Sequence, residues 1–154
     1  MDELKVINEV DSIQYIVIGL GEEQYGVDIK YIDSILRMQR ITRVPKVAAH
    51  LKGVINLRGE VIPVMSLRLK MNLPEDEITR ATRIIILKLE QYGMIGIIVD
   101  EVKEVVTLTS DQVQKISYDP KDESTNYING VGKFDGELIS LLDFNLVMQE
   151  KENV

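Results

Sequence analysis

The chain has 154 residues, of which 45% are apolar and 28% charged, a composition typical of a globular protein with one ordinary domain or two small ones. It contains no cysteine, which excludes disulfides and thiol chemistry, and no apolar run approaches the roughly 20 residues that span a bilayer. The net charge of −7 argues against broad nucleic-acid binding, because affinity for phosphates comes from accumulated Lys and Arg.

The first elements in chain order are short strands and turns. The acidic start, MDELKVINEVDS, lacks the basic and apolar regions of a signal peptide, which favours a cytoplasmic location. The β-branched run Ser12–Leu20 predicts a buried strand, and EEQYGVDI after it predicts a tight turn into a second strand. Asp28 then has the position of a helix cap, and the spacing of Ile29, Ile32 and Leu36 predicts one apolar face of a brief helix.

The next segment, Ser34–Gly59, contains no acid and six basic residues, which are Arg37, Arg40, Arg43, Lys46, Lys52 and Arg58. A solvated basic face is the plainest interpretation, and a docking surface for an acidic partner is the second. RNA binding is third, because the segment has no aromatic side chain on which a base could stack.

A hairpin in the first half of the chain returns in the second half. VINLRGEVIPVMS (Val54–Ser66) resembles VGKFDGELISLLD (Val131–Asp143), which lies 77 residues further on. In the second copy Asp135-Gly136 predicts a type I′ turn, because both central residues of that turn need a positive φ. The letters EQYG also occur twice, starting at positions 23 and 90. We therefore expect one fold unit of about 70 residues that is used twice.

Short strands with glycine turns and no long amphipathic helix favour small barrels, which remove the exposed edges of a sheet. We expect an all-β protein of two tandem five-stranded β-barrels, with short helical connections and a short C-terminal helix. The expected boundaries are 12–70 for the first barrel, 71–81 for a charged linker and 82–148 for the second barrel. Whether the barrels share strands stays open at this point.

The residues give little support to catalysis. His50 is the only histidine and lies in a basic, loop-like stretch without a serine elbow, so neither a histidine-based triad nor a His/Cys zinc site is expected. Gly130, Gly132 and Gly136 differ by one residue from a dinucleotide fingerprint, but they lie inside a hairpin and not between a strand and a helix. We expect a binding module and not an enzyme, with no catalytic residue, cofactor or metal.

Six motifs, in order and spacing, extend over nearly the whole chain: YGVDI (Tyr25–Ile29), ITRVP (Ile41–Pro45), GVINLRGEVIPVMSLR (Gly53–Arg68), GIIVDEV (Gly96–Val102), INGVGK (Ile128–Lys133) and LISLLD (Leu138–Asp143). With these motifs the chain resembles the CheW family of bacterial chemotaxis coupling proteins. The NLRG core followed by VIPV is the most specific of them. The resemblance implies that the two five-stranded barrels are SH3-like.

The resemblance also implies partners. A CheW protein is a cytoplasmic scaffold in a two-component system; it couples the helical tips of methyl-accepting receptors to the regulatory domain of the histidine kinase CheA. It associates with membrane-bound receptor arrays without entering the membrane. In that family a groove between the two barrels accepts the receptor. The receptor-binding positions that match here are Ile32, Gly53, Arg58 and Val99, whereas no residue can be tied to the kinase.

The residues themselves allow plainer roles for three of these positions. Ile32 could be part of the core, Gly53 could permit a close approach of strands, and Arg58 could form an ion pair across its hairpin, for example with Glu60. Many relatives carry an acid where this chain has Ser34, so a charge contact there is either missing or made by Asp33. A nucleic-acid-binding β-barrel that uses the basic residues 37–58 is the alternative function.

Overall fold

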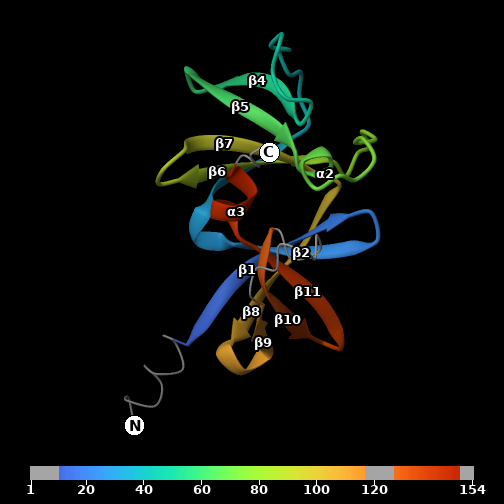
Figure 1. Ribbon diagram of the computed structural model, residues 1–154, viewed down its shortest axis with the longest axis vertical. Coiled ribbons are helices and arrows are strands. Elements are labelled where there is room, and N and C mark those ends of the chain that lie inside the picture. The colour runs from blue at the N-terminus through green and yellow to red at the C-terminus, as the bar shows by residue number, and fades with distance from the viewer. Residues whose placement is uncertain (1–10, 117–126, 150–154) are drawn as a thin grey trace, which may run out of the picture. The chain divides into compact units, whose positions relative to one another are not determined.

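The computed structural model describes residues 11–116 and 127–149, and strands dominate this part of the chain (Figure 1). The expected all-β class with two β-sheet subdomains is confirmed. None of the helices among the described residues is long and apolar enough to cross a membrane.

The chain divides into two compact units that are interleaved in sequence. Unit 1 comprises the described residues within Met1–Val17, Gln24–Ile29 and Glu104–Val154. Unit 2 comprises Ile18–Glu23 and Lys30–Lys103. These units correct the expected division into the consecutive segments 12–70 and 82–148, and the expected linker 71–81 belongs to unit 2.

Five strands form one sheet in the order β3-β6-β7-β5-β4: β3 (Ile32–Arg37), β6 (Arg83–Leu89), β7 (Gly93–Val99), β5 (Glu60–Ser66) and β4 (Leu51–Leu57). All of these strands lie in unit 2. Their inward-facing residues form an aliphatic core of Ile55, Ile62, Val64, Ile84, Ile86 and Ile98. Burial of such side chains is the main favourable term in folding, at about 25 cal/mol per Å².

Six strands form the other sheet in the order β8-β1-β2-β11-β10-β9: β8 (Glu101–Thr109), β1 (Ser12–Leu20), β2 (Glu23–Asp28), β11 (Glu137–Leu142), β10 (Ile128–Phe134) and β9 (Val113–Lys115). The three-residue strand β9 raises the strand number above the expected five. A second core cluster contains Tyr15, Val17, Val106, Leu108, Ile139 and Leu141.

The strand orders show that the two halves of the sequence exchange hairpins. Strand β5 of the first half pairs in parallel with β7 of the second half, where Val64 lies opposite Gly96. Strand β11 of the second half likewise pairs in parallel with β2 of the first half, where Leu141 lies opposite Gly26. Each sheet therefore combines the first hairpin of one half with the last hairpin of the other. This exchange is the reason why the compact units are not consecutive in sequence.

Glycine permits these close parallel contacts. A Cβ atom on Gly96 would come within 3.2 Å of a methyl group of Val64, and one on Gly26 within 2.9 Å of a methyl group of Leu141. Contacts this short require the neighbouring chains to move apart. The same small residue therefore stands at the same place in both sheets.

The local elements follow the sequence in most places. Asp135 and Gly136 have φ values of 52° and 78°, so the predicted turn with two positive φ angles is confirmed. The expected C-terminal helix is present as α3 (Phe144–Met148), and a second short helix, α2 (Leu67–Lys70), follows β5. The expected helix after Asp28 is wrong: only a 3-10 turn, η1 (Ile29–Tyr31), precedes β3.

Candidate protein-binding site

Arg58 lies at the tip of the β4–β5 hairpin of unit 2. Its φ is 51° and that of Gly59 is 82°, and the Gly59 N–H donates a hydrogen bond of 3.2 Å to Asn56 Oδ1. A residue with a side chain is unfavourable in this left-handed conformation by about 1–2 kcal/mol. Arg58 therefore occupies a position where asparagine, aspartate or glycine would be the more stable choice.

The side chain of Arg58 reaches an acid on another strand. Its Nη2 atom donates to Asp33 Oδ2 at 3.0 Å, and Ser34 Oγ donates to the same oxygen at 3.0 Å. Asp33 lies where the pairing of β3 with β6 shifts its register. Arg58 thus pairs with Asp33, the acid next to Ser34, and not with Glu60.

This ion pair contributes little to stability, because the Arg58 side chain is 70% exposed and water screens the interaction. Its effect is on position. β3 and β4 are the two edge strands of the five-stranded sheet. The pair therefore links Asp33 on edge strand β3 to Arg58 in the turn that follows the other edge strand, β4. It leaves an oriented guanidinium on the surface of unit 2.

Ile32 is the first residue of β3 and precedes Asp33 directly. It is half-buried and lies opposite Leu87 of β6. It belongs to a strand and not to the core face of a helix, contrary to the expected local structure. Ile29 and Ile35, three positions before and after it in the sequence, are each 39% exposed. The structure therefore pairs Arg58 with Asp33, the residue that follows Ile32 on β3.

Gly53 has a backbone role. Its φ is 146°, and a Cβ atom there would lie 2.1 Å from the carbonyl oxygen of Thr42. Thr42 pairs with Val54 through two hydrogen bonds of 2.8 Å, which attach the segment after β3 to the edge strand β4. Any side chain at position 53 would push this segment away, so the close-approach interpretation of Gly53 is confirmed.

Val99, the fourth expected contact residue, ends strand β7 and is fully buried. A side chain with no exposed surface cannot touch a partner unless the fold opens. The structure thus argues against direct contact by Val99 and assigns it to packing. Ile32 and Arg58 remain as surface positions.

One interaction between distant residues had no sequence signal. The guanidinium of Arg68 donates from Nε to Asp100 Oδ1 (2.7 Å) and from Nη2 to Asp100 Oδ2 (2.6 Å), and the Gly21 N–H donates to Asp100 Oδ2 (2.7 Å). The hydrogen bond from Arg68, assisted by the Gly21 amide, lowers the pKa of Asp100 although partial burial opposes this shift. Arg68 and Asp100 are 32 positions apart, and no spacing rule predicts such a pair.

The basic segment is partly neutralised. Lys52 forms an ion pair with Glu75, and Arg58 forms one with Asp33. Both pairs reduce the charge available to a polyanion, so the nucleic-acid alternative is not favoured. Within residues 11–116 and 127–149, no group of three His, Cys, Asp or Glu side chains is placed to hold a metal ion.

Comparison with known proteins agrees with this geometry. The CheW-like domain family matches residues 14–152. The chain is 35% identical over 138 residues to the chemotaxis protein CheW of Bacillus subtilis, which covers 90% of this chain and 88% of that protein. It is 30% identical over 131 residues to the chemotaxis protein CheW of Thermotoga maritima, covering 85% and 84%.

A solved structure has the same fold. The crystal structure of the scaffolding protein TtCheW from Thermoanaerobacter tengcongensis superposes with a TM-score of 0.81 at 27% identity, covering 90% of this chain and 93% of that one. The family match extends over nearly the whole chain, and the paired hairpin motifs lie within it. The chain therefore belongs to the CheW-like domain family of chemotaxis proteins.

Proposed function

We propose that this protein is a chemotaxis scaffold that joins the helical tips of methyl-accepting receptors to the regulatory domain of the histidine kinase CheA. It works in the cytoplasm, beside membrane-bound receptor arrays, and catalyses no reaction itself. The match of the CheW-like domain to residues 14–152 is the observation that carries the adaptor role. The relatives named chemotaxis protein CheW and the scaffolding protein TtCheW support it.

The receptor contact is assigned to the surface of unit 2 formed by Ile32, Asp33 and Arg58. Ile32 supplies half-buried apolar area, and Arg58 supplies an exposed guanidinium that pairs with Asp33, the residue next to Ile32. Arginine is one of the residue types enriched among those that carry most of the binding energy of protein interfaces. Gly53 acts indirectly, because it allows the Thr42 segment to pair with β4.

A scaffold transmits a signal only if its contacts differ in free energy between the signalling states of its partners. Receptor tip and kinase held together then influence each other through this chain. We assign no residue to the kinase contact.

The receptor assignment is tested by two matched pairs of variants in a pull-down with a receptor tip fragment. Arg58→Asn keeps a residue suited to positive φ but removes the ion pair, and Asp135→Asn makes the same residue at the equivalent turn of the other hairpin. Ile32→Asp puts a charge at the start of β3, and Val102→Asp does so at a half-buried position near the start of β8.

We expect receptor binding to weaken at least tenfold in Arg58→Asn and Ile32→Asp, which corresponds to about 1.4 kcal/mol or more. Asp135→Asn and Val102→Asp should bind as the parent does. Circular dichroism confirms that each variant is folded. Unchanged binding by a folded Ile32→Asp variant would remove this surface from the proposal.

A further inference from the structure

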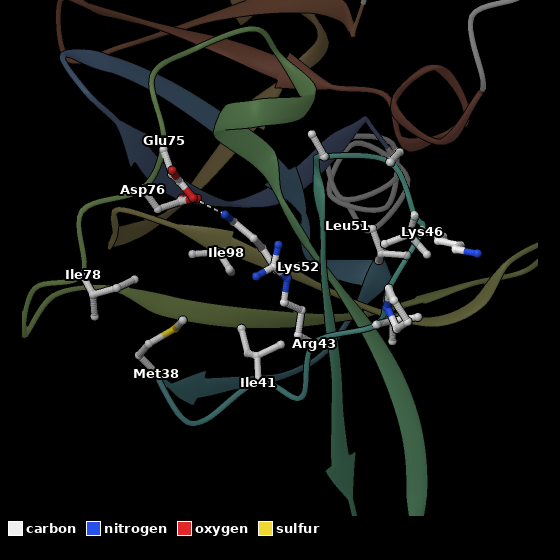
Figure 2. A pocket seen from close by; sticks show the side chains of 15 residues that line it. Met38, Ile41, Arg43, Lys46, Leu51, Lys52, Glu75, Asp76, Ile78 and Ile98 are labelled. Carbon is white, nitrogen blue, oxygen red and sulfur yellow. Dashed lines mark hydrogen bonds and ion pairs between the residues drawn. The ribbon is translucent and has the colours of Figure 1, made fainter.

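Unit 2 contains a hollow of about 560 Å³ that none of the four expected receptor-binding residues lines. It is lined by the segment that follows β3, by the start of β4 and by Glu75, Asp76 and Ile78 (Figure 2). A cavity of this size lies in the range of sites that hold a small ligand or a few residues of a peptide.

The inner wall of the hollow is apolar, formed by Met38, Ile41, Leu51 and Ile98 (Figure 2). Apolar residues also line it near the surface, where Val47 is 40% and Ile78 57% exposed. Exposed aliphatic side chains beside an apolar cavity provide a place where a partner can bury a bulky apolar group.

Two cationic residues line the same hollow, Arg43 and Lys46. Neither forms an ion pair with an acid among residues 11–116 and 127–149. The third cation of the lining, Lys52, is paired with Glu75, as the dashed line in Figure 2 marks. The lining also contains two acids, Glu75 and Asp76, so its three cations leave a net charge of +1, which favours an occupant that carries a carboxylate.

Asp76 is the second acid of the lining. Its Oδ2 atom accepts a hydrogen bond from Ser66 Oγ, whereas its Oδ1 atom is buried and accepts none from the described residues. Because Oδ1 has almost no accessible surface, an occupant of the hollow does not reach it, and Asp76 contributes only its negative charge to the lining. Asp76 lines the hollow close to the Lys52–Glu75 pair (Figure 2).

We propose that this hollow binds an acidic segment of a partner protein, in which a bulky apolar side chain lies beside a carboxylate. The apolar side chain packs against the inner wall, and the carboxylate lies near Arg43 and Lys46.

The test uses the full chain labelled with ¹⁵N and a peptide probe, acetyl-Glu-Asp-Leu-Phe-Asp-amide. We expect saturable shifts of the amide signals of Lys46, Val47, Asp76 and Ile78 at millimolar peptide. One control peptide has Ala in place of Leu and Phe, and another has Lys in place of the three acids. Absence of saturable shifts with the probe, or equal shifts with both control peptides, overturns the proposal.

Variants locate the binding and separate it from receptor binding. Arg43→Glu should weaken the affinity for the probe peptide at least tenfold. Arg80→Glu, which reverses the charge of an exposed residue outside the lining, should leave that affinity unchanged. Arg58→Asn should also leave probe binding unchanged, because Arg58 is not part of the lining. Equal losses in Arg43→Glu and Arg80→Glu would show attraction by overall charge and contradict a specific site.

Discussion

Gly53 is the residue whose chemistry is most narrowly fixed by its surroundings. It combines a φ of 146° with a backbone carbonyl 2.1 Å from where a Cβ would be. Its counterpart in the repeat, Gly130, lies at the equivalent bulge of the β10–β11 hairpin. The motif around Gly53 was apparent from the sequence, but its cause was not, because Thr42 approaches it only in the folded chain.

Gly53→Ala should lower the free energy of unfolding by about 2–3 kcal/mol, because it combines a disfavoured φ with a clash against rigid backbone. Gly59→Ala is the matched control: φ is also positive there, at 82°, but no atom lies within 4 Å of the added carbon. Gly59→Ala should lower the free energy of unfolding by only about 1 kcal/mol. Urea unfolding followed by circular dichroism measures both, and equal losses would refute the role of the Thr42 contact.

Three elements of unit 2 meet at Asp100. Arg68 of α2 and the turn after β1, through Gly21, both donate hydrogen bonds to its carboxylate at the junction of β7 and β8. The side chains of Arg68 and Asp100 are only 17% and 27% exposed, so solvent screens this pair less than the pair of Arg58. The interaction fixes the position of α2 against the strand junction.

The lowered pKa of Asp100 makes this contribution dependent on pH. An acid whose pKa is depressed by folding stabilises the native state above its ordinary pKa of about 3.9, and the contribution disappears as the pH falls through the depressed value. The free energy of unfolding of Asp100→Asn should therefore be about 1–2 kcal/mol lower than that of the parent at neutral pH, and the difference should shrink progressively below about pH 4.

Urea unfolding of the parent and of Asp100→Asn over that pH range tests this prediction. Glu75→Gln serves as the control, since the Glu75 side chain is 67% exposed and its pairing with Lys52 should matter little. A constant difference between parent and Asp100→Asn at all pH values would contradict the assignment.

The element level also shows where sequence reasoning succeeds and where it fails. Turn chemistry at Asp135-Gly136 and the β-branched run of β1 predicted their structures. Ile29, Ile32 and Leu36 have the spacing of one helix face, but pairing with β6 places Ile32 and Leu36 in strand β3. The repeated letters EQYG do not mark equivalent structure. Their first copy lies in β2, whereas most of their second copy forms the turn before β7.

The candidate site was predictable only in part. The resemblance to CheW proteins selected Ile32 and Arg58, which are accessible, and also Val99, which is buried. The sequence could not choose between Asp33 and Glu60 as the partner of Arg58, because that choice depends on how the two sheet edges approach each other. The acid-free basic segment gave a signal for the cations of the hollow, Arg43 and Lys46, but not for the hollow itself, because it is lined by segments at least 20 positions apart.

Across the whole molecule, the exchange of hairpins decides what can fold. The repeat was visible in the sequence. Because the two halves have similar hydrophobic patterns, however, a hairpin of one half could pair with strands of either half, and the sequence does not show which pairing occurs. In the structure, the first half supplies β1 and β2 to one sheet and β3, β4 and β5 to the other. A separated half therefore leaves both sheets incomplete.

Fragments 1–77 and 78–154 should consequently fail to fold alone and should fold when mixed or expressed together. Each fragment alone is expected to show no cooperative unfolding transition, because it lacks the strands that cover its apolar faces. The mixture should recover the β-sheet spectrum and elute as a one-to-one complex. A cooperative transition in either fragment alone would contradict the exchanged topology.

The exchange also bears on how such a chain arises. One copy of the repeat lacks strands of both sheets. Two separate copies complete both sheets if the first hairpin of each copy pairs with the last hairpin of the other. Joined in a single polypeptide, the copies meet at an effective concentration set by the connecting residues and not by the amount of protein in the cell. Gene fusion thereby converts an association that dilution would reverse into folding that dilution leaves intact.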